Sequence, residues 1–235
     1  MNIALIIAGG TGKRTQQEIP KQFINVHDKP ILLYTLGGFQ KHPDIHAIAV
    51  VCLNGWQEIL AAYTRQFDIS KLKWVVDGGD TGQESIRNGV FELYKHGQAD
   101  DIVIIHDGIR PLIDMAVLSD CITVCKEHGN AVSSLPYNEQ IFKTSDGLTT
   151  TEYIPRETLR RVQTPQAYTL GKLYQSYKEA FEKEIGIYGS SYTNTMMVEL
   201  GETLHFAAGS DKNIKITTAD DIQLFKALLK METGN

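Results

Sequence analysis

The first apolar run of the chain ends in a glycine-rich turn that is followed by two cations. Residues 8–14 have the sequence A-G-G-T-G-K-R. Glycines let backbone N–H groups approach phosphate oxygens closely, and cations offset the phosphate charge. Two familiar phosphate loops do not fit, because a Walker loop needs glycine where Ile7 stands and a Rossmann fingerprint needs glycine where Thr15 stands. The turn by itself is weak evidence for phosphate binding.

Several polar motifs follow this turn along the chain. The first is P-K-Q-F at 20–23. The four later motifs are D-G-G-D at 77–80 with Ser85 after it, H-D-G-I-R-P at 106–111, T-P-Q at 164–166 and N-I-K-I-T at 213–217. Such residues suit nucleotidyl transfer, in which an acceptor phosphate oxygen attacks the α-phosphorus of a nucleotide and pyrophosphate leaves. The protein then mainly positions the two reactants and stabilises charge.

In the same order, these motifs resemble the methylerythritol phosphate cytidylyltransferase family, which includes ribitol 5-phosphate cytidylyltransferases. The turn at 8–14 with 20–23 is similar to the family's nucleotidylyltransferase signature, and 77–80 with Ser85 is similar to its cytidine-binding segment. Residues 106–111 resemble its V-H-D-x-x-R-P motif. The resemblance covers nearly the whole chain. It implies a nucleotidyltransferase that moves a cytidylyl group from CTP to a small polyol phosphate and releases pyrophosphate.

Cations from several segments are the candidate catalytic residues. Because two anions must approach each other in this reaction, positive charges have to converge on them. Arg14, Lys21 and Lys215 each lie in one of the motifs. A single lysine or arginine is usually a solvated surface charge, but inside these motifs we favour the catalytic role.

Asp107 is the candidate metal ligand. It directly follows the apolar run before it, so we expect it at the carboxyl end of a strand. A carboxylate there can ligate Mg²⁺, which prefers one or two carboxylates plus phosphate oxygens; the alternative is an aspartate that caps a helix or turn. Mg²⁺ is therefore the expected cofactor. We expect His106 to be structural and Arg110 to bind the acceptor phosphate through two parallel hydrogen bonds.

Glycines and one hydroxyl are expected to form the nucleotide site. Gly78, Gly79 and Ser85 can offer backbone groups and a hydroxyl to the exocyclic amine and N3 of cytosine, the base that the resemblance implies. The expected nucleotide-binding residues are Ala8, Gly9, Gly10, Thr11, Gly12, Gly78, Gly79, Ser85 and Asp107.

The acceptor side departs from the family pattern. The segment 136–143 has one residue more than the family's P-V-x-D-T-x-K, and the family's T-D-E-A is T-N-T-M at 193–196. Neutral side chains there accept hydrogen bonds more weakly and can also donate, which favours a different hydroxyl pattern. We therefore predict D-ribitol 5-phosphate as the acceptor, with 2-C-methyl-D-erythritol 4-phosphate as the close alternative. The corresponding pathways are teichoic acid or capsule synthesis and isoprenoid biosynthesis. The expected acceptor-binding residues are Arg110, Arg156 and Thr193.

Short apolar runs that alternate with helical patterns must position these residues. Strands are predicted at 3–8, 47–53, 73–76, 101–106 and 131–135, and helices at 30–40, 55–65, 85–94, 115–128 and from about Thr218, which Asp221 caps. Strands this apolar are typical of a parallel sheet covered on both faces. The expected fold is α/β, an open, mainly parallel sheet flanked by helices in a Rossmann-like nucleotidylyltransferase fold. One domain spans 1–235, with its ligand crevice at the carboxyl ends of the strands.

Residues 137–157 break this pattern. They are polar and threonine-rich, with a turn at 145–147 between two short extended segments. This predicts a projecting β-hairpin arm; a disordered loop is the alternative. In the resembling family such an arm crosses to a second subunit, and an arginine at its end contacts the neighbour's substrate. Arg156 fits that position, which implies a homodimer with shared active sites.

Composition limits the other possibilities. A net charge of −5 does not favour nucleic-acid binding, and three cysteines form neither a disulfide framework nor a zinc pattern. The apolar N-terminal run is too short for a signal peptide or a membrane span, so we expect a cytoplasmic protein without a membrane partner. The rival hypotheses are a UTP- or GTP-dependent nucleotidylyltransferase, a GT-A glycosyltransferase, whose D-x-D motif is missing here, and an inactive nucleotide-binding homologue.

Overall fold

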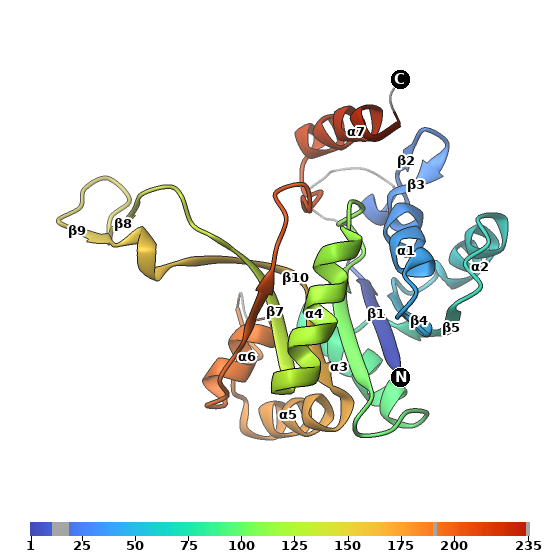
Figure 1. Ribbon diagram of the computed structural model, residues 1–235, viewed down its shortest axis with the longest axis horizontal. Helices are drawn as coiled ribbons and strands as arrows, with labels where there is room; N and C mark the ends of the chain where they lie inside the picture. Colours follow the sequence, from blue (N-terminus) through green and yellow to red (C-terminus); the bar gives the residue numbers. More distant parts are fainter. Residues whose placement is uncertain (11–18, 190–191, 234–235) are drawn as a thin grey trace.

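A seven-stranded sheet forms the centre of the computed structural model, which describes residues 1–10, 19–189 and 192–233 (Figure 1). The strand order is β11-β7-β10-β6-β1-β4-β5. The strands are β1 (Asn2–Ala8), β4 (Ala47–Cys52), β5 (Leu72–Asp77), β6 (Ile102–Asp107), β7 (Asn130–Pro136), β10 (Arg160–Thr169) and β11 (Phe206–Ala208).

The sheet is mostly parallel, as predicted. The strands β6, β1, β4 and β5 run parallel to one another, and β10 lies antiparallel between β6 and β7. The chain moves outward from β1 through β4 to β5 and then returns to β6 on the other side of β1. Ligands bind open α/β sheets at the carboxyl ends of the strands where the order reverses in this way.

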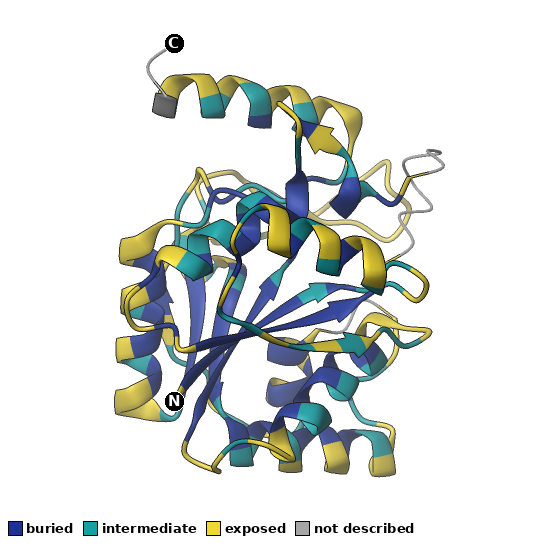
Figure 2. Ribbon diagram, turned by 90° about the vertical axis from the view of Figure 1, so that its right-hand side faces the viewer, coloured by how far each residue is buried: buried dark blue, intermediate teal, exposed yellow. Residues whose placement is uncertain are grey.

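Helices cover both faces of the sheet. One face carries α1 (Ile31–Lys41), α2 (Gln57–Gln66) and α4 (Met115–His128), and the other carries α3 (Gly82–Tyr94), α5 (Leu170–Lys183) and α6 (Thr193–Glu199). Alternate residues of β1 enter the two cores, Ala4 and Ile6 on the first face and Ile3 and Leu5 on the second. Figure 2 shows the strands as a buried layer between helices with exposed outer surfaces. Burial on both faces explains the unbroken apolar runs.

A third apolar cluster lies beyond the carboxyl edge of the sheet. It joins the hairpin of β2 (Asn25–Val26) and β3 (Lys29–Pro30) to α7 (Ala219–Thr233), whose Phe225 is fully buried and meets the ring of Tyr34 edge-on at 5.1 Å. The predicted start of α7 is confirmed, because the Asp221 carboxylate accepts from the Thr218 N–H at 2.7 Å. The short 3-10 helix η2 (Lys21–Phe23) packs against α1.

The predicted arm projects from the sheet in Figure 1. It consists of β8 (Ile141–Lys143) and β9 (Glu152–Ile154), which pair antiparallel, followed by the 3-10 helix η3 (Arg156–Thr158). Its apolar side chains are exposed, Phe142 by 54% and Tyr153 by 68%. A hairpin of this size has no core of its own.

Several elements were not predicted. The most important is β10, whose first half is polar and which contains Pro165, a residue that cannot donate to a strand ladder. α5, α6, β2, β3 and β11 were also missed, whereas the predicted elements differ from the observed ones by three residues or fewer at each end. All three cysteines are buried free thiols. Within the described ranges, no helix has the length and apolarity needed to cross a bilayer.

Candidate active site

A cavity of about 780 Å³ lies where the carboxyl ends of β1, β5 and β6 meet. In the sheet register, Ile7 pairs with Asp107, and Ala8 pairs with Cys52, which in turn pairs with Asp77. Motifs far apart in the sequence therefore end side by side. The predicted site residues that line the cavity are Ala8, Gly9, Gly10, Lys21, Gly78, Gly79, Ser85, Asp107, Thr193 and Lys215.

The glycines allow two turns to lie against each other at the carboxyl ends of β1 and β5. A Cβ atom on Gly78 would stand 3.2 Å from the Cα of Gly9 and 3.3 Å from the backbone oxygen of Cys52. One on Gly79 would stand 2.4 Å from the Cβ of Glu84, at the start of α3. Side chains at these positions would push the turns apart and narrow the cavity.

Ser85 supports this turn from within. Its hydroxyl oxygen accepts from the Gly79 N–H at 3.0 Å. The first turn of α3 is held by a capping box, in which the Thr81 hydroxyl accepts from the Glu84 N–H at 3.1 Å and the Glu84 carboxylate accepts from the Thr81 N–H at 3.0 Å. The start of α3 is thereby fixed at the cavity wall.

Gln22 has a role that sequence reasoning missed. Its side-chain amide is buried and donates to the backbone oxygens of Ala8 at 2.8 Å and Gly10 at 3.0 Å. These bonds attach η2, and with it Lys21, to the end of β1. On the other side of η2, the ring of Phe23 stacks on Trp56 at 4.6 Å. The P-K-Q-F motif was visible in the sequence, but the reach of the amide back to the turn was not.

The charges converge on Asp107. Its carboxylate accepts from the Lys215 ammonium at 3.1 Å and from Nε of Arg110 at 2.9 Å. The backbone N–H of Asp107 donates to the hydroxyl of Thr164 at 3.2 Å, which ties β6 to the T-P-Q motif. Side-chain exposure is 21% for Asp107, 13% for Arg110 and 30% for Lys215. The cluster is therefore partly desolvated but open to a ligand.

Burial and the neighbouring cations change the pKa of Asp107 in opposite directions. Burial alone raises this pKa, but Lys215 and then Arg110 outweigh it and hold the pKa below its ordinary value. Asp107 is therefore ionised at neutral pH. Burial lowers the pKa of the adjacent His106 to about 4, so this imidazole is neutral. His106 is fully buried beside the ring of Phe39 and away from the cavity.

The segment that carries Lys215 is fastened on both sides. The N–H of Ile216 donates to the backbone oxygen of Ile109 at 2.9 Å, and both side chains enter the third apolar cluster. The Asn213 side chain donates to the backbone oxygen of Thr164 at 2.7 Å. The Lys215 ammonium also lies 5.5 Å from the centre of the Tyr192 ring. Its position thus depends on β6, β10 and α7 together.

The predicted acceptor residues lie at three different places. Thr193 lines the cavity, where its hydroxyl lies 2.8 Å from that of Tyr177. Arg110 lines an adjoining hollow. Arg156 lines neither space and donates to the backbone oxygen of Asn138 on the arm at 3.0 Å. The predicted residues Thr11, Gly12 and Arg14 lie outside the described residues.

The donor set at Asp107 fits Mg²⁺ only together with substrate phosphates. No group of three or more His, Cys, Asp or Glu side chains that could hold a metal occurs in the part of the chain that the structure describes. A single ionised carboxylate at a cavity edge is what Mg²⁺ uses when phosphate oxygens supply its other ligands. Asp107 meets this requirement.

Comparison with known proteins identifies similar sequences over nearly the whole chain. The model of the family described as 2-C-methyl-D-erythritol 4-phosphate cytidylyltransferase (IspD) matches residues 2–231. A ribitol-5-phosphate cytidylyltransferase of Lacticaseibacillus paracasei is 57% identical over 98% of this chain and 98% of its own length. A 2-C-methyl-D-erythritol 4-phosphate cytidylyltransferase of Alkaliphilus metalliredigens is 33% identical over 96% of this chain and 91% of its own length.

A solved structure shows the same fold. The 4-diphosphocytidyl-2C-methyl-D-erythritol synthase of Anaerococcus prevotii superposes with a TM-score of 0.81 at 20% identity, over 97% of this chain and 96% of its own. At this identity the comparison establishes the arrangement of the sheet and helices. It confirms the predicted nucleotidylyltransferase fold.

The lowered pKa of Asp107 predicts a pH-dependent contribution to stability. The ion pairs stabilise the fold above the pKa of the unfolded carboxyl, about 4, and this contribution is lost as the pH falls through the lower folded pKa. Asp107→Asn should lower the free energy of unfolding at pH 7 by about 1–3 kcal/mol, since Lys215 and Arg110 lose the negative charge with which they pair. Urea unfolding of both proteins at pH 7 and pH 3 measures the difference, which should shrink at pH 3.

Asp100→Asn is the matched control for this experiment, because Asp100 is exposed. It should change the free energy of unfolding little at either pH. A difference between wild type and Asp107→Asn that is equally large at both pH values would contradict the predicted role of the ion pairs.

Proposed function

Because the chain belongs to the 2-C-methyl-D-erythritol 4-phosphate cytidylyltransferase (IspD) family, we propose that it transfers the cytidylyl group of CTP to a polyol phosphate. The observation that carries this proposal is the cavity in which glycine turns and Lys21 meet the cluster of Asp107 and Lys215. Close backbone approach suits a nucleotide, and converging cations suit a reaction between two anions. The relatives named above are cytidylyltransferases, which favours this activity over the rival glycosyltransferase and the inactive homologue.

The proposed reaction is an in-line displacement at phosphorus. An oxygen of the acceptor phosphate forms a bond to the α-phosphorus of CTP, the bond from this phosphorus to the bridging oxygen breaks, and pyrophosphate leaves with that electron pair. Lys21, Lys215 and Arg14 are the proposed catalytic residues that offset the negative charge on the reacting phosphates. Gly78, Gly79 and Ser85 are the proposed cytosine site.

Mg²⁺ is the proposed cofactor, with Asp107 as its protein ligand. The ion supplies positive charge to the triphosphate when it is bound. Lys215 and Arg110 hold the ionised Asp107 carboxylate. Phosphate oxygens are better partners for these cations, so we propose that substrate binding draws them from the carboxylate and frees it for the metal.

D-Ribitol 5-phosphate is the proposed acceptor. The relative that is 57% identical bears the name of a ribitol-5-phosphate enzyme, whereas the methylerythritol phosphate enzymes stand at about 33%. The neutral residues of the T-N-T-M segment, at the positions of the family's acidic ones, support the same choice. Teichoic acid or capsule synthesis is the pathway class that this acceptor suggests. A cytoplasmic location follows from the donor, since CTP is made and used there.

We further propose a homodimer in which the arm of one subunit reaches the active site of the other. The exposed Phe142 and Tyr153 need a partner surface, and Arg156 lies at the end of the arm, outside the cavity of its own chain. A second copy of this chain can cover these two aromatic rings. Its active site, with a bound phosphate substrate, can offer negative charge to Arg156.

Pyrophosphate release from each nucleoside triphosphate tests the proposed function. CTP with D-ribitol 5-phosphate and Mg²⁺ should give the highest kcat/KM, and chelation of the metal should abolish turnover. A tenfold or greater preference for 2-C-methyl-D-erythritol 4-phosphate would overturn the assignment of the acceptor. Equal turnover with UTP or GTP would overturn the assignment of CTP as the donor. We expect Gly78, Gly79 and Ser85 to contact the base and thereby to give the preference for cytosine.

Lys21→Ala should lower kcat by about 10²–10³ without loss of folded protein, because one preorganised charge-stabilising group is removed. Lys73→Ala, at an exposed position of β5 away from the cavity, is the control and should keep wild-type kcat. Steady-state kinetics at saturating substrates, with thermal melts of each variant, give the measurement. A Lys21→Ala enzyme with more than about a third of wild-type kcat would show that Lys21 has another role.

The shared active site predicts complementation between two inactive variants. Lys21→Ala and Arg156→Ala are each expected to be nearly inactive. In a mixed dimer, the subunit with intact Lys21 receives the intact Arg156 of its partner, so unfolding and refolding the two variants together should restore activity. Deletion of 141–150 should give monomers in sedimentation and lower activity. A fully active monomer, or no recovery on mixing, would refute the shared site.

A further inference from the structure

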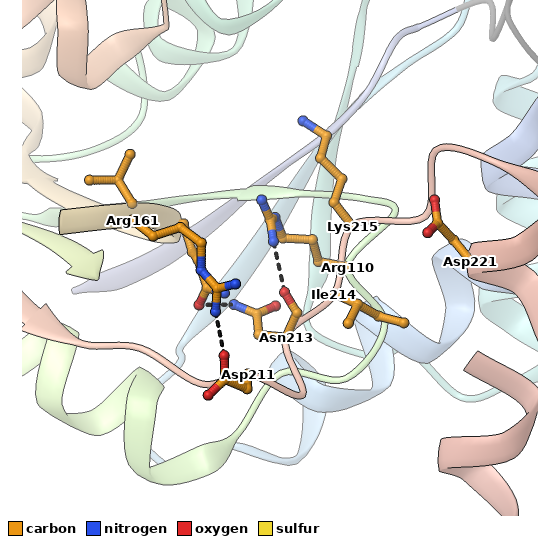
Figure 3. A pocket seen from close by; sticks show the side chains of 9 residues that line it. Arg110, Arg161, Asp211, Asn213, Ile214, Lys215 and Asp221 are labelled. Carbon is orange, nitrogen blue, oxygen red and sulfur yellow. Dashed lines mark hydrogen bonds and ion pairs between the residues drawn. The ribbon is translucent and has the colours of Figure 1, made fainter. Parts of the chain in front are cut away.

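The lining of the nucleotide cavity has a charged part and a neutral part. Asp107 and Lys215 belong to the charged part, where Figure 3 shows Lys215 beside Arg110. The neutral part comes from α3 and the start of α6, and it includes Gln83 and Thr193. A polyol phosphate likewise has one charged end and a chain of uncharged hydroxyl groups. The neutral part is therefore the one that suits these hydroxyl groups.

Behind the neutral part, three hydrogen bonds form a chain that joins α3, α5 and α6. The side-chain nitrogen of Gln83 donates to the backbone oxygen of Gly186 at 2.7 Å, and its side-chain oxygen accepts from the Tyr177 hydroxyl at 2.9 Å. The Tyr177 hydroxyl also lies 2.8 Å from that of Thr193. Tyr177 is fully buried, and Gln83 and Thr193 show only a small part of their surface. Water therefore does not compete for these bonds.

The chain of bonds has a fixed starting point at Gly186. This residue has a φ of +63°, and a Cβ atom on it would stand 2.7 Å from the Cα of Met196 in α6. The turn thus requires glycine, and the backbone oxygen that it presents can only accept. A Gln83 amide turned the other way would set its own oxygen against this oxygen. The amide nitrogen must therefore face Gly186, and the amide oxygen must face Tyr177.

The direction of the remaining hydrogen bonds follows from this orientation. Burial raises the pKa of Tyr177, so the phenol keeps its single hydrogen at neutral pH. The Gln83 oxygen, which can only accept, takes that hydrogen. The contact between Tyr177 and Thr193 then requires the Thr193 hydroxyl to be the donor. Thr193 thus uses its only hydrogen inside the protein, and toward the cavity its oxygen can only accept.

We infer that Tyr177, oriented by Gln83, is a positioning residue that makes Thr193 a hydrogen-bond acceptor for a hydroxyl group of the polyol. The inference rests on the proposed function. Ionised phosphate oxygens also accept, so they gain nothing from such a group, whereas a polyol hydroxyl can donate to it. Tyr177 does not line the cavity, and it acts through Thr193. A buried polar chain of this kind orders its members only while every link is made.

Tyr177→Phe tests the inference, because it removes one hydroxyl and keeps the ring. The variant should raise KM for the polyol phosphate about fivefold or more, since the hydrogen of Thr193 is no longer directed away from the cavity. KM for CTP and kcat should stay within about twofold. Steady-state kinetics and thermal melts of each protein give the measurement. An unchanged KM for the polyol phosphate would overturn the inference, and so would an equal rise in KM for CTP.

Tyr34→Phe is the matched control. The Tyr34 hydroxyl also makes one hydrogen bond, to the backbone oxygen of Val26 at 2.7 Å, and it lies in the third apolar cluster and not in the cavity lining. This variant loses a bond of the same kind, so its melting temperature should fall while both KM values remain near wild type. A rise in KM for the polyol phosphate as large as that of Tyr177→Phe would show that lost stability is the cause.

A double-mutant cycle tests whether Tyr177 acts through Thr193. Thr193→Val removes the hydroxyl at nearly constant shape and should raise KM for the polyol phosphate about tenfold, whereas Thr193→Ser should recover most of the loss. Adding Tyr177→Phe to Thr193→Val should raise this KM no further, because the group that Tyr177 orients is already gone. Effects that multiply in the double variant would overturn the inference.

Analogues of D-ribitol 5-phosphate that each lack one hydroxyl identify the group that donates to Thr193. One analogue should lose about fivefold or more in kcat/KM with the wild type and lose nothing further with Thr193→Val. Equal losses with both proteins for every analogue would show that Thr193 binds none of these hydroxyl groups.

The proposed function and this inference fail in different ways. A wild type that turns over no polyol phosphate would refute the proposed function. Calorimetric titration of D-ribitol 5-phosphate into wild type, Tyr177→Phe and Thr193→Val still tests the inference in that case. Weaker binding by both variants supports it, and equal affinities or no binding by the wild type overturn it.

Discussion

The carboxylate of Asp107, held between Lys215 and Arg110, is the interaction on which the rest of the site depends. It joins the end of β6 to a segment near the C-terminus that belongs to no strand of the central sheet. A partly buried carboxylate is stable only with its charge partners, and two cations placed near each other are stable only with the carboxylate between them. Each member therefore constrains the position of the other two.

This arrangement also fixes the side chains of the cluster relative to one another. Lys215 and Arg110 each pair with the Asp107 carboxylate, and these pairs hold the three side chains in defined positions. Under the proposed function, phosphate oxygens would compete for Lys215 and Arg110, and the released carboxylate would suit a metal ion. Two further hydrogen bonds hold the segment that carries Lys215. One joins Ile216 to Ile109, and the other joins Asn213 to Thr164.

Under the proposed function, different parts of the fold bind the two substrates. The donor side is built on adjacent ends of parallel strands, where Gly9 and Gly78 approach closely and leave little freedom for other residues. The proposed acceptor side draws on the loop after β6, the arm and the start of α6, where the predicted residues Arg110, Arg156 and Thr193 lie. Such segments tolerate change better than close backbone contacts do. On this proposal, the acceptor can change while the donor site stays the same.

Residue types and spacing were enough to predict the α/β sheet, the arm and the place of Asp107 at a strand end. These features are local, because periodicity, glycine content and strand ends are written in short stretches of chain. The antiparallel β10 was missed, since its polar first half and Pro165 give no strand signal. The bonds from Gln22 to the β1 turn, from Lys215 to Asp107 and from Asn213 to Thr164 depended on tertiary structure. They join residues distant in sequence, and only the packing of the sheet and its connections brings their side chains within hydrogen-bonding distance or around one pocket.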